Sequence, residues 1–170
     1  QRFDEAGLNH PEVARELDLS IDWDTDNFSK YMASADVLIT WDLPTEGLAK
    51  AAPNLKWIHI IGAGVEHLAP MDWLPAEVVL TNNKGVHAKK GGEFGIMSIL
   101  MLHNHMPQLI HNQAVAKYDS LYSTPIAGKT LVIIGTGSIG RSVAQQAKAM
   151  GVYVIGVSRH GHKVPELDET

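Results

Sequence analysis

The stretch TLVIIGTGSIGRSVAQQAKAMGVYVIGVSR, residues 130–159, decides the fold. It starts with a short apolar run, 130–135, and continues through 138–150, where apolar residues recur at helical spacing. A second run of β-forming residues, 152–157, closes it. Short apolar runs that alternate with an amphipathic helix are typical of parallel strands joined by a crossover helix. We therefore predict a strand, helix, strand unit in a doubly wound α/β domain.

Three glycines, Gly135, Gly137 and Gly140, join the first strand to the helix in the pattern G-x-G-x-x-G. The first allows a tight turn, the second lets a pyrophosphate approach the backbone, and the third lets helix and strand pack closely. The unpaired amides at the helix start, at Ser138 and Ile139, can then hold phosphate oxygens. A plain strand-to-helix turn also favours glycine, but the full context predicts a dinucleotide-binding site.

The end of the second strand lacks an acidic residue. Units of this kind carry Asp or Glu roughly 20 residues beyond the glycines, to accept hydrogen bonds from a ribose 2′-hydroxyl. Here Ser158 stands at that place, Arg159 follows it, and Lys163 is nearby. A guanidinium makes charge-assisted and often bidentate bonds to phosphate, so we predict that these three residues favour NADP over NAD as cofactor. NAD remains the alternative cofactor, and a solvated basic loop would also explain the charges.

Three apolar runs in the first half of the chain predict another parallel sheet. They cover 35–41, 55–62 and 77–82, with short helical stretches between them. We predict a small doubly wound layer over residues 1–90, followed by a second domain over residues 91–170 that contains the glycine motif.

A long amphipathic segment opens the predicted second domain. Residues 91–118 keep apolar side chains at helical spacing, and Pro107 should kink or restart this linking helix because proline lacks an amide hydrogen. The segment is rich in Leu, Ile and Met, and carries more apolar surface than one small layer can cover. We therefore expect this helix to bridge two domains or to lie against a second subunit, in a homodimer that forms through helix 91–118.

The amino-acid composition limits the classes of binding partner that we expect. The 170 residues are 45% hydrophobic and 19% charged, with a net charge of −5 and no cysteine. This balance is globular, and it indicates neither a nucleic-acid surface nor a membrane-binding one. No apolar stretch reaches the roughly 18 residues of a membrane span. We expect small-molecule partners, a cytoplasmic location and no metal site, since His103 and His105 would point away from each other on a helix.

Several segments together resemble the D-isomer-specific 2-hydroxyacid dehydrogenase family, most closely its glyoxylate/hydroxypyruvate reductase A type. They are ADVLITW, LKWIHIIGAGVEHL, VVLTNNKGVHAKKGGEFGIMSILML and IAGKTLVIIGTGSIGRSVAQQAKAMGVYVIGVSR, in the family's order and spacing. The resemblance implies an NAD(P)-dependent oxidoreductase that reduces a small 2-oxoacid to a D-2-hydroxyacid by hydride transfer from NADPH. It also implies that this chain is the N-terminal part of such an enzyme, with part of a flavodoxin-like substrate domain over residues 1–90 and the first half of a Rossmann domain over residues 91–170.

The resemblance also implies a substrate site. The backbone amides of Ala63, Gly64 and Val65 match the loop that binds the substrate carboxylate, and Trp41 matches a position that lines the site. Taken alone, a glycine-rich loop after a strand also fits an ordinary turn, and a tryptophan there also fits the core. The stretch HAKKGGE, residues 87–93, departs from the family pattern, which puts contacts from that loop to the nicotinamide in doubt.

The catalytic arginine, histidine and carboxylate of the family have no counterpart in this chain. We expect them beyond Thr170, and we expect the chain alone to be inactive. A different class of function stays open: a nucleotide-sensing, corepressor-like binding protein on the same scaffold, because a fold does not fix a function.

Overall fold

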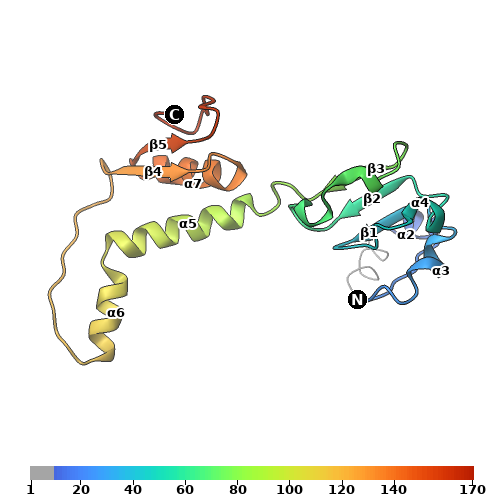
Figure 1. Ribbon diagram of the computed structural model, residues 1–170. Coiled ribbons are helices and arrows are strands. Elements are labelled where there is room, and N and C mark those ends of the chain that lie inside the picture. Colours follow the sequence, from blue (N-terminus) through green and yellow to red (C-terminus); the bar gives the residue numbers. More distant parts are fainter. Residues whose placement is uncertain (1–9) are drawn as a thin grey trace. The chain divides into compact units, whose positions relative to one another are not determined.

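The computed structural model describes residues 10–170 and shows an α/β chain with two compact units, which divide between Asn82 and Asn83 (Figure 1). The first nine residues of the predicted domain 1–90 lie outside the described residues. Within residues 10–170 the strands of both units pair in parallel, as the α/β prediction requires.

The first unit is a three-stranded parallel sheet in the order β1-β2-β3. Its strands pair in register, with Thr40 beside Ile60 and Ile60 beside Asn82 at their carboxyl ends. The elements in chain order are α2 (Pro11–Ala14), α3 (Phe28–Met32), β1 (Val37–Thr40), α4 (Leu48–Ala51), β2 (Trp57–Ile60), the 3₁₀ turns η1 (Glu66–Leu68) and η2 (Met71–Trp73), and β3 (Val79–Asn82). The three strands fall inside the apolar runs that predicted them.

The core of this unit lies on one face of the sheet. Ile58 and Ile60, two residues apart on β2, are fully buried, while Trp57 on the same strand is partly exposed. Side chains alternate between the two faces of a strand, so one face packs on the short helices. Burial of each isoleucine contributes about 1.5–3 kcal/mol. The core residues are Met32, Leu43, Leu48, Ala52, Leu55, Ile58, Ile60, Leu68 and Val78.

The second unit contains the predicted strand, helix, strand arrangement. Strands β4 and β5 pair in parallel from Thr130 beside Tyr153 to Ile134 beside Val157. Its elements are α5 (Ala88–His103), α6 (Met106–Ala114), β4 (Thr130–Ile134), α7 (Ser138–Ala149) and β5 (Tyr153–Val157). The buried cluster of Ala144, Ala147, Val152, Val154 and Leu167 joins α7 to β5.

The predicted helix 91–118 is two helices, because the chain restarts at Pro107. Helix α5 ends at His103, His105 takes a left-handed conformation with φ of 55°, and α6 begins with proline in its first turn. Proline is tolerated there because the amides of a first turn have no partner within the helix. Helix α6 ends at Ala114, earlier than predicted, and Ala116 follows with φ of 51°.

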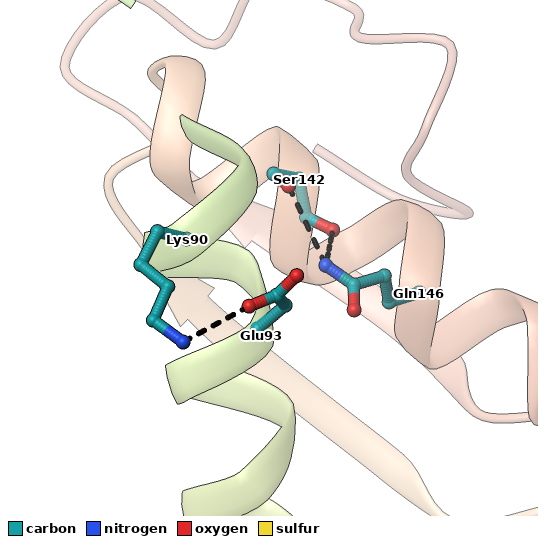
Figure 2. Close-up of polar contacts among 4 residues, drawn as sticks. All are labelled: Lys90, Glu93, Ser142 and Gln146. Carbon is teal, nitrogen blue, oxygen red and sulfur yellow. Dashed lines mark hydrogen bonds and ion pairs between the residues drawn. The ribbon is translucent and has the colours of Figure 1, made fainter. Parts of the chain in front are cut away.

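Helix α5 packs closely on α7 where α5 carries glycines. Figure 2 shows Ser142 and Gln146 of α7 beside the turn of α5 that carries Lys90 and Glu93. A Cβ atom on buried Gly92 would collide with the side chains of Ser142 and Gln146. The unusual glycines of the 87–93 stretch therefore have a packing role.

We predict that Gly95→Ala destabilises this unit. The added Cβ would lie 2.5 Å from Val143 Cγ2, and Val143 is buried. Overpacking costs about 1–3 kcal/mol and the higher helix propensity of alanine returns about 1 kcal/mol, so we expect the free energy of unfolding in urea to fall by up to about 2 kcal/mol.

Gly91→Ala is the matched control for this prediction. Its Cβ would lie 3.1 Å from Ile139 Cγ2, and Ile139 is half exposed and can shift. Equal stability of the two variants would contradict the close packing of α5 on α7.

Candidate functional site

The glycine loop after β4 has the geometry that its motif predicts. Gly135 has φ of +98°, a conformation that suits glycine, and its amide donates to Val157 O at 2.8 Å. A Cβ on Gly140 would collide with the carbonyl oxygen of Gly135. Gly137 caps α7 and has open space where its Cβ would be. The loop therefore presents the first amides of α7, those of Ser138 and Ile139, with no side chain at Gly137 to block an anion.

The cationic segment starts beside this loop. The bond from Gly135 to Val157 O places the end of β5 next to the glycines, and Ser158 is the following residue. Ser158 Oγ accepts a hydrogen bond from the Gly161 amide at 3.2 Å, which closes a short turn. Arg159 and Lys163 are both exposed. The structure thus brings Ser158 to the glycine loop and leaves both cations accessible from solvent.

The residues after this turn are fixed to α7 by two ion pairs. Arg141 donates to both carboxylate oxygens of Glu166, from Nη2 at 2.8 Å and from Nε at 3.0 Å. Lys148 Nζ lies 2.8 Å from Asp168 Oδ1, while Asp168 Oδ2 accepts from the Val154 amide at 2.7 Å. The hydrogen bonds from Arg141 and Lys148 lower the pKa of Glu166 and of Asp168, respectively. Both carboxyl groups are therefore ionised at neutral pH.

Another cluster lies at the carboxyl edge of the first unit's sheet. Trp41, directly after β1, stacks on His67 with ring centroids 5.9 Å apart and ring planes 8° apart. His67 Nε2 lies 3.1 Å from Trp41 O. A Cβ on Gly62 would lie 2.6 Å from Trp41 Cζ3, so this stack requires glycine there. Trp41 is 60% exposed, which excludes the core role that a tryptophan after a strand also fits.

The loop of Ala63, Gly64 and Val65 follows β2 at the same edge. Asn82, the last residue of β3, donates from Nδ2 to Ala63 O at 3.0 Å and anchors the loop. This hydrogen bond involves the carbonyl oxygen of Ala63 and not its amide N–H. In open parallel sheets, ligands bind outside the carboxyl ends of the strands, which is where Trp41 and this loop lie.

The second unit matches a known domain family. Residues 96–170 match the NAD binding domain of D-isomer specific 2-hydroxyacid dehydrogenases, which accounts for the glycine loop and both flanking strands. Residues 96–170 therefore belong to the D-isomer specific 2-hydroxyacid dehydrogenase family, as its NAD binding domain. The resemblance of the quoted segments to this family is confirmed.

Solved structures of this dehydrogenase family cover both units. A family member from Aeromonas salmonicida is 28% identical with a TM-score of 0.73, over 97% of this chain and 54% of that one. An NADPH-dependent glyoxylate/hydroxypyruvate reductase from Sinorhizobium meliloti, solved with NADP and sulfate, is 26% identical with a TM-score of 0.64. That match covers 79% of this chain and 42% of the reductase.

A curated relative points to the same family. The hydroxypyruvate reductase of Thermotoga maritima is 27% identical over 134 residues, which are 76% of this chain and 44% of that protein. This chain spans less than half the length of each of the first curated relatives that it matches.

The sequence pattern alone does not indicate several residues of these clusters. His67 and Asn82 organise the surroundings of Trp41 and Ala63, and Glu166 and Asp168 hold the segment after the cationic turn. The alternation of basic residues at 159–163 with acidic ones at 166–169 was a signal for the last two. Between residues 10 and 170, no cluster of three or more His, Asp or Glu side chains could hold a metal, and no helix is long and apolar enough to cross a membrane.

We predict that two glycine substitutions separate folding from nucleotide binding. Gly140→Ala drives a Cβ into the Gly135 carbonyl, so it should destabilise the unit and abolish binding together. Gly137→Ala meets no atom within 4 Å and its φ of −76° suits alanine, so the thermal midpoint should stay within about 2 °C.

The affinity of Gly137→Ala for nucleotide shows whether the glycine loop is a binding site. The methyl group at position 137 would occupy the space that the pyrophosphate needs, so we expect the Kd of either nicotinamide nucleotide to rise at least about tenfold. Unchanged affinity in Gly137→Ala would show that the loop is only a turn. Titration by nucleotide fluorescence and thermal unfolding supply the two measurements.

Proposed function

We propose that the polypeptide containing this chain is an NADP(H)-dependent reductase of small 2-oxoacids of the glyoxylate or hydroxypyruvate kind. The observation that carries this proposal is the end of β5, where Ser158 lies beside the glycine loop and no carboxylate stands between Ser158 and Glu166. A carboxylate there would repel a 2′-phosphate, whereas a hydroxyl and cations attract one. The Sinorhizobium meliloti reductase, described as NADPH-dependent, is a relative with the matching preference.

In this proposal the second unit holds the cofactor. The amides of Ser138 and Ile139 would bind the pyrophosphate at the α7 start, where partial positive charge favours anions. Ser158, Arg159 and Lys163 would bind the 2′-phosphate. The nicotinamide, when bound, supplies a hydride to the 2-oxo carbon of the substrate.

The first unit would hold the substrate. Amides of Ala63, Gly64 and Val65 would bind the carboxylate of the 2-oxoacid, since successive amides in a loop form an anion-binding concavity. Trp41 would cover the apolar side of a small substrate, and its stack on His67 keeps the exposed ring in one orientation. The residues that donate the proton and clamp the carboxylate from the other side would lie outside residues 1–170.

We also propose a homodimer through α5. One face of this helix packs on α7 through its glycines, and another exposes Phe94 at 63% and Leu102 at 67%. Apolar side chains of this size on one helix favour contact with a second copy. A cytoplasmic location remains part of the proposal because the chain has no cysteine, which suits a reducing compartment.

The first test is an assay of the full-length polypeptide with glyoxylate and hydroxypyruvate. We expect NADPH to be oxidised with a kcat/KM at least about tenfold above that for NADH, and Arg159→Ala to remove most of this preference. The loss of nicotinamide absorbance measures both rates. A preference for NADH would contradict the cofactor assignment, and no oxidation with either 2-oxoacid would favour a nucleotide-sensing binding protein.

A second prediction concerns the substrate loop. Gly62→Ala should push the Trp41 ring off His67, because the new Cβ would lie 2.6 Å from the ring. We expect the KM for the 2-oxoacid to rise about fivefold or more with the Kd of NADPH unchanged, since even a small misplacement of a positioning group weakens binding. Steady-state kinetics with both ligands varied give the two constants.

The double variant Trp41→Ala, Gly62→Ala is the control for this prediction. If Gly62 acts through Trp41, adding Gly62→Ala to Trp41→Ala should cause no further rise in KM. Additive effects of the two substitutions would contradict the link between Gly62 and the tryptophan.

A further inference from the structure

The turn that carries Arg159 and Lys163 is fixed at both ends. Its first residue, Ser158, continues β5 directly. Its far end continues into residues 164–169, a segment without helix or ladder apart from one isolated bridge between Ile155 and Glu169. The position of the second cation, Lys163, therefore depends on what holds residues 164–169.

Backbone and apolar contacts seat this segment on β5. The Asp168 amide donates to Val154 O, and the Gly156 amide donates to Glu169 O, both at 2.8 Å. Leu167 is 9% exposed and lies where a side chain on Gly156 would otherwise be. These contacts place Asp168 and Glu169 alongside β5, beside Val154 to Gly156.

The two ion pairs then tie the segment to α7. Arg141 and Lys148 are seven residues apart, which is two helical turns, so both project from the same face of α7. Arg141 directly follows Gly140, so its bidentate bond to Glu166 joins the segment to the first turn of the phosphate-binding helix. All four side chains are partly exposed, so each pair contributes little to global stability.

We propose that Glu166 and Asp168 are positioning residues for cofactor choice, which hold the 158–163 turn in place so that its cations meet the 2′-phosphate. This inference rests on the proposed use of NADP(H). Neither carboxylate contacts the cofactor in this arrangement. Without the ion pairs, the turn and its long side chains would be ordered only when a nucleotide binds. The entropic cost of that ordering would weaken the binding of NADPH, because only NADPH carries the 2′-phosphate that the turn contacts.

The ratio of two affinities separates this role from a general structural one. NADPH and NADH share the pyrophosphate, which binds at the glycine loop, and differ at the 2′ position. Damage to the whole unit would weaken both nucleotides alike. If loss of Glu166 releases the Arg141 side chain, that side chain could reach only the pyrophosphate, which both nucleotides carry. Its release would therefore change both Kd values alike and leave the ratio of the two Kd values unchanged.

The test uses Glu166→Gln, Asp168→Asn and their combination in the full-length polypeptide. Asp168→Asn keeps an oxygen that can accept from the Val154 amide, so it removes the charge with little change in shape. We expect the combined variant to raise the Kd of NADPH about tenfold and to change that of NADH less than about twofold. The single variants should give smaller changes in the same direction, and they serve if the combined variant fails to fold.

Glu169→Gln is the matched control from the same segment. Its carboxylate accepts from the Tyr153 hydroxyl at 2.9 Å and, among the described residues, makes no ion pair with α7. We expect it to leave both Kd values within about twofold of the wild type.

The outcomes distinguish this inference from the proposed function. Equal changes for both nucleotides, or no change for either, in the Glu166 and Asp168 variants overturn the positioning role. If Arg159→Ala lowers the NADPH preference in the same assay, the cofactor assignment survives that result. A wild type that binds both nucleotides equally would overturn the cofactor assignment and this inference with it.

Discussion

The close approach of α7 to the turn after β4 is the constraint on which the second unit depends. At Gly140 the helix backbone passes so near the Gly135 carbonyl that no side chain fits between them. This approach starts α7 directly at the end of a parallel strand, so its first amides face the open space at Gly137. It also lets the Gly135 amide pair with Val157 O, which fixes the end of β5 beside the loop. The turn after β4, the start of α7 and the place where the cationic segment begins therefore depend on this contact.

The same kind of contact recurs at other glycines in both units. Glycines 92 and 95 let α5 lie against α7, and Gly62 gives room to the Trp41 ring. Leu167 occupies the space where a side chain on Gly156 would lie, so the segment after the cationic turn can pack on β5. In each case a missing side chain lets a neighbour come closer than a Cβ would permit, and close-packed interiors respond to changes of even one methyl group. Substitutions at these glycines should therefore alter local geometry before they alter the fold.

The sequence predicted the elements well because they depend on local patterns. Short apolar runs located the five strands found within residues 10–170, and helical spacing located α7. Pro107 predicted the break before α6. The two helices are fully separate because His105 adopts a left-handed conformation, which its residue type does not predict. Local rules determine where an element begins and ends, so they were sufficient for the fold.

The parts that the sequence did not predict are contacts between distant residues. His67 stacks on Trp41 across 26 positions, and Arg141 pairs with Glu166 across 25, so neither pair forms a local pattern. Charged residues in a loop usually indicate a solvated surface. For this reason the sequence did not indicate that Glu166 and Asp168 form ion pairs with α7. Only the paired register of β5 and the following segment brings these acids to α7.

The order of charges along the chain gives the ion pairs a second effect. The cations at 159 and 163 are followed at once by Glu166, Asp168 and Glu169, in a chain whose net charge is −5. Unpaired, these carboxylates would lie within about one Debye length of the turn and would oppose a bound phosphate. Arg141 and Lys148 neutralise two of them locally, so the positive potential of the turn remains available. Helix α7 would thus support phosphate binding twice, through the amides at its start and through two cations that pair with nearby acids.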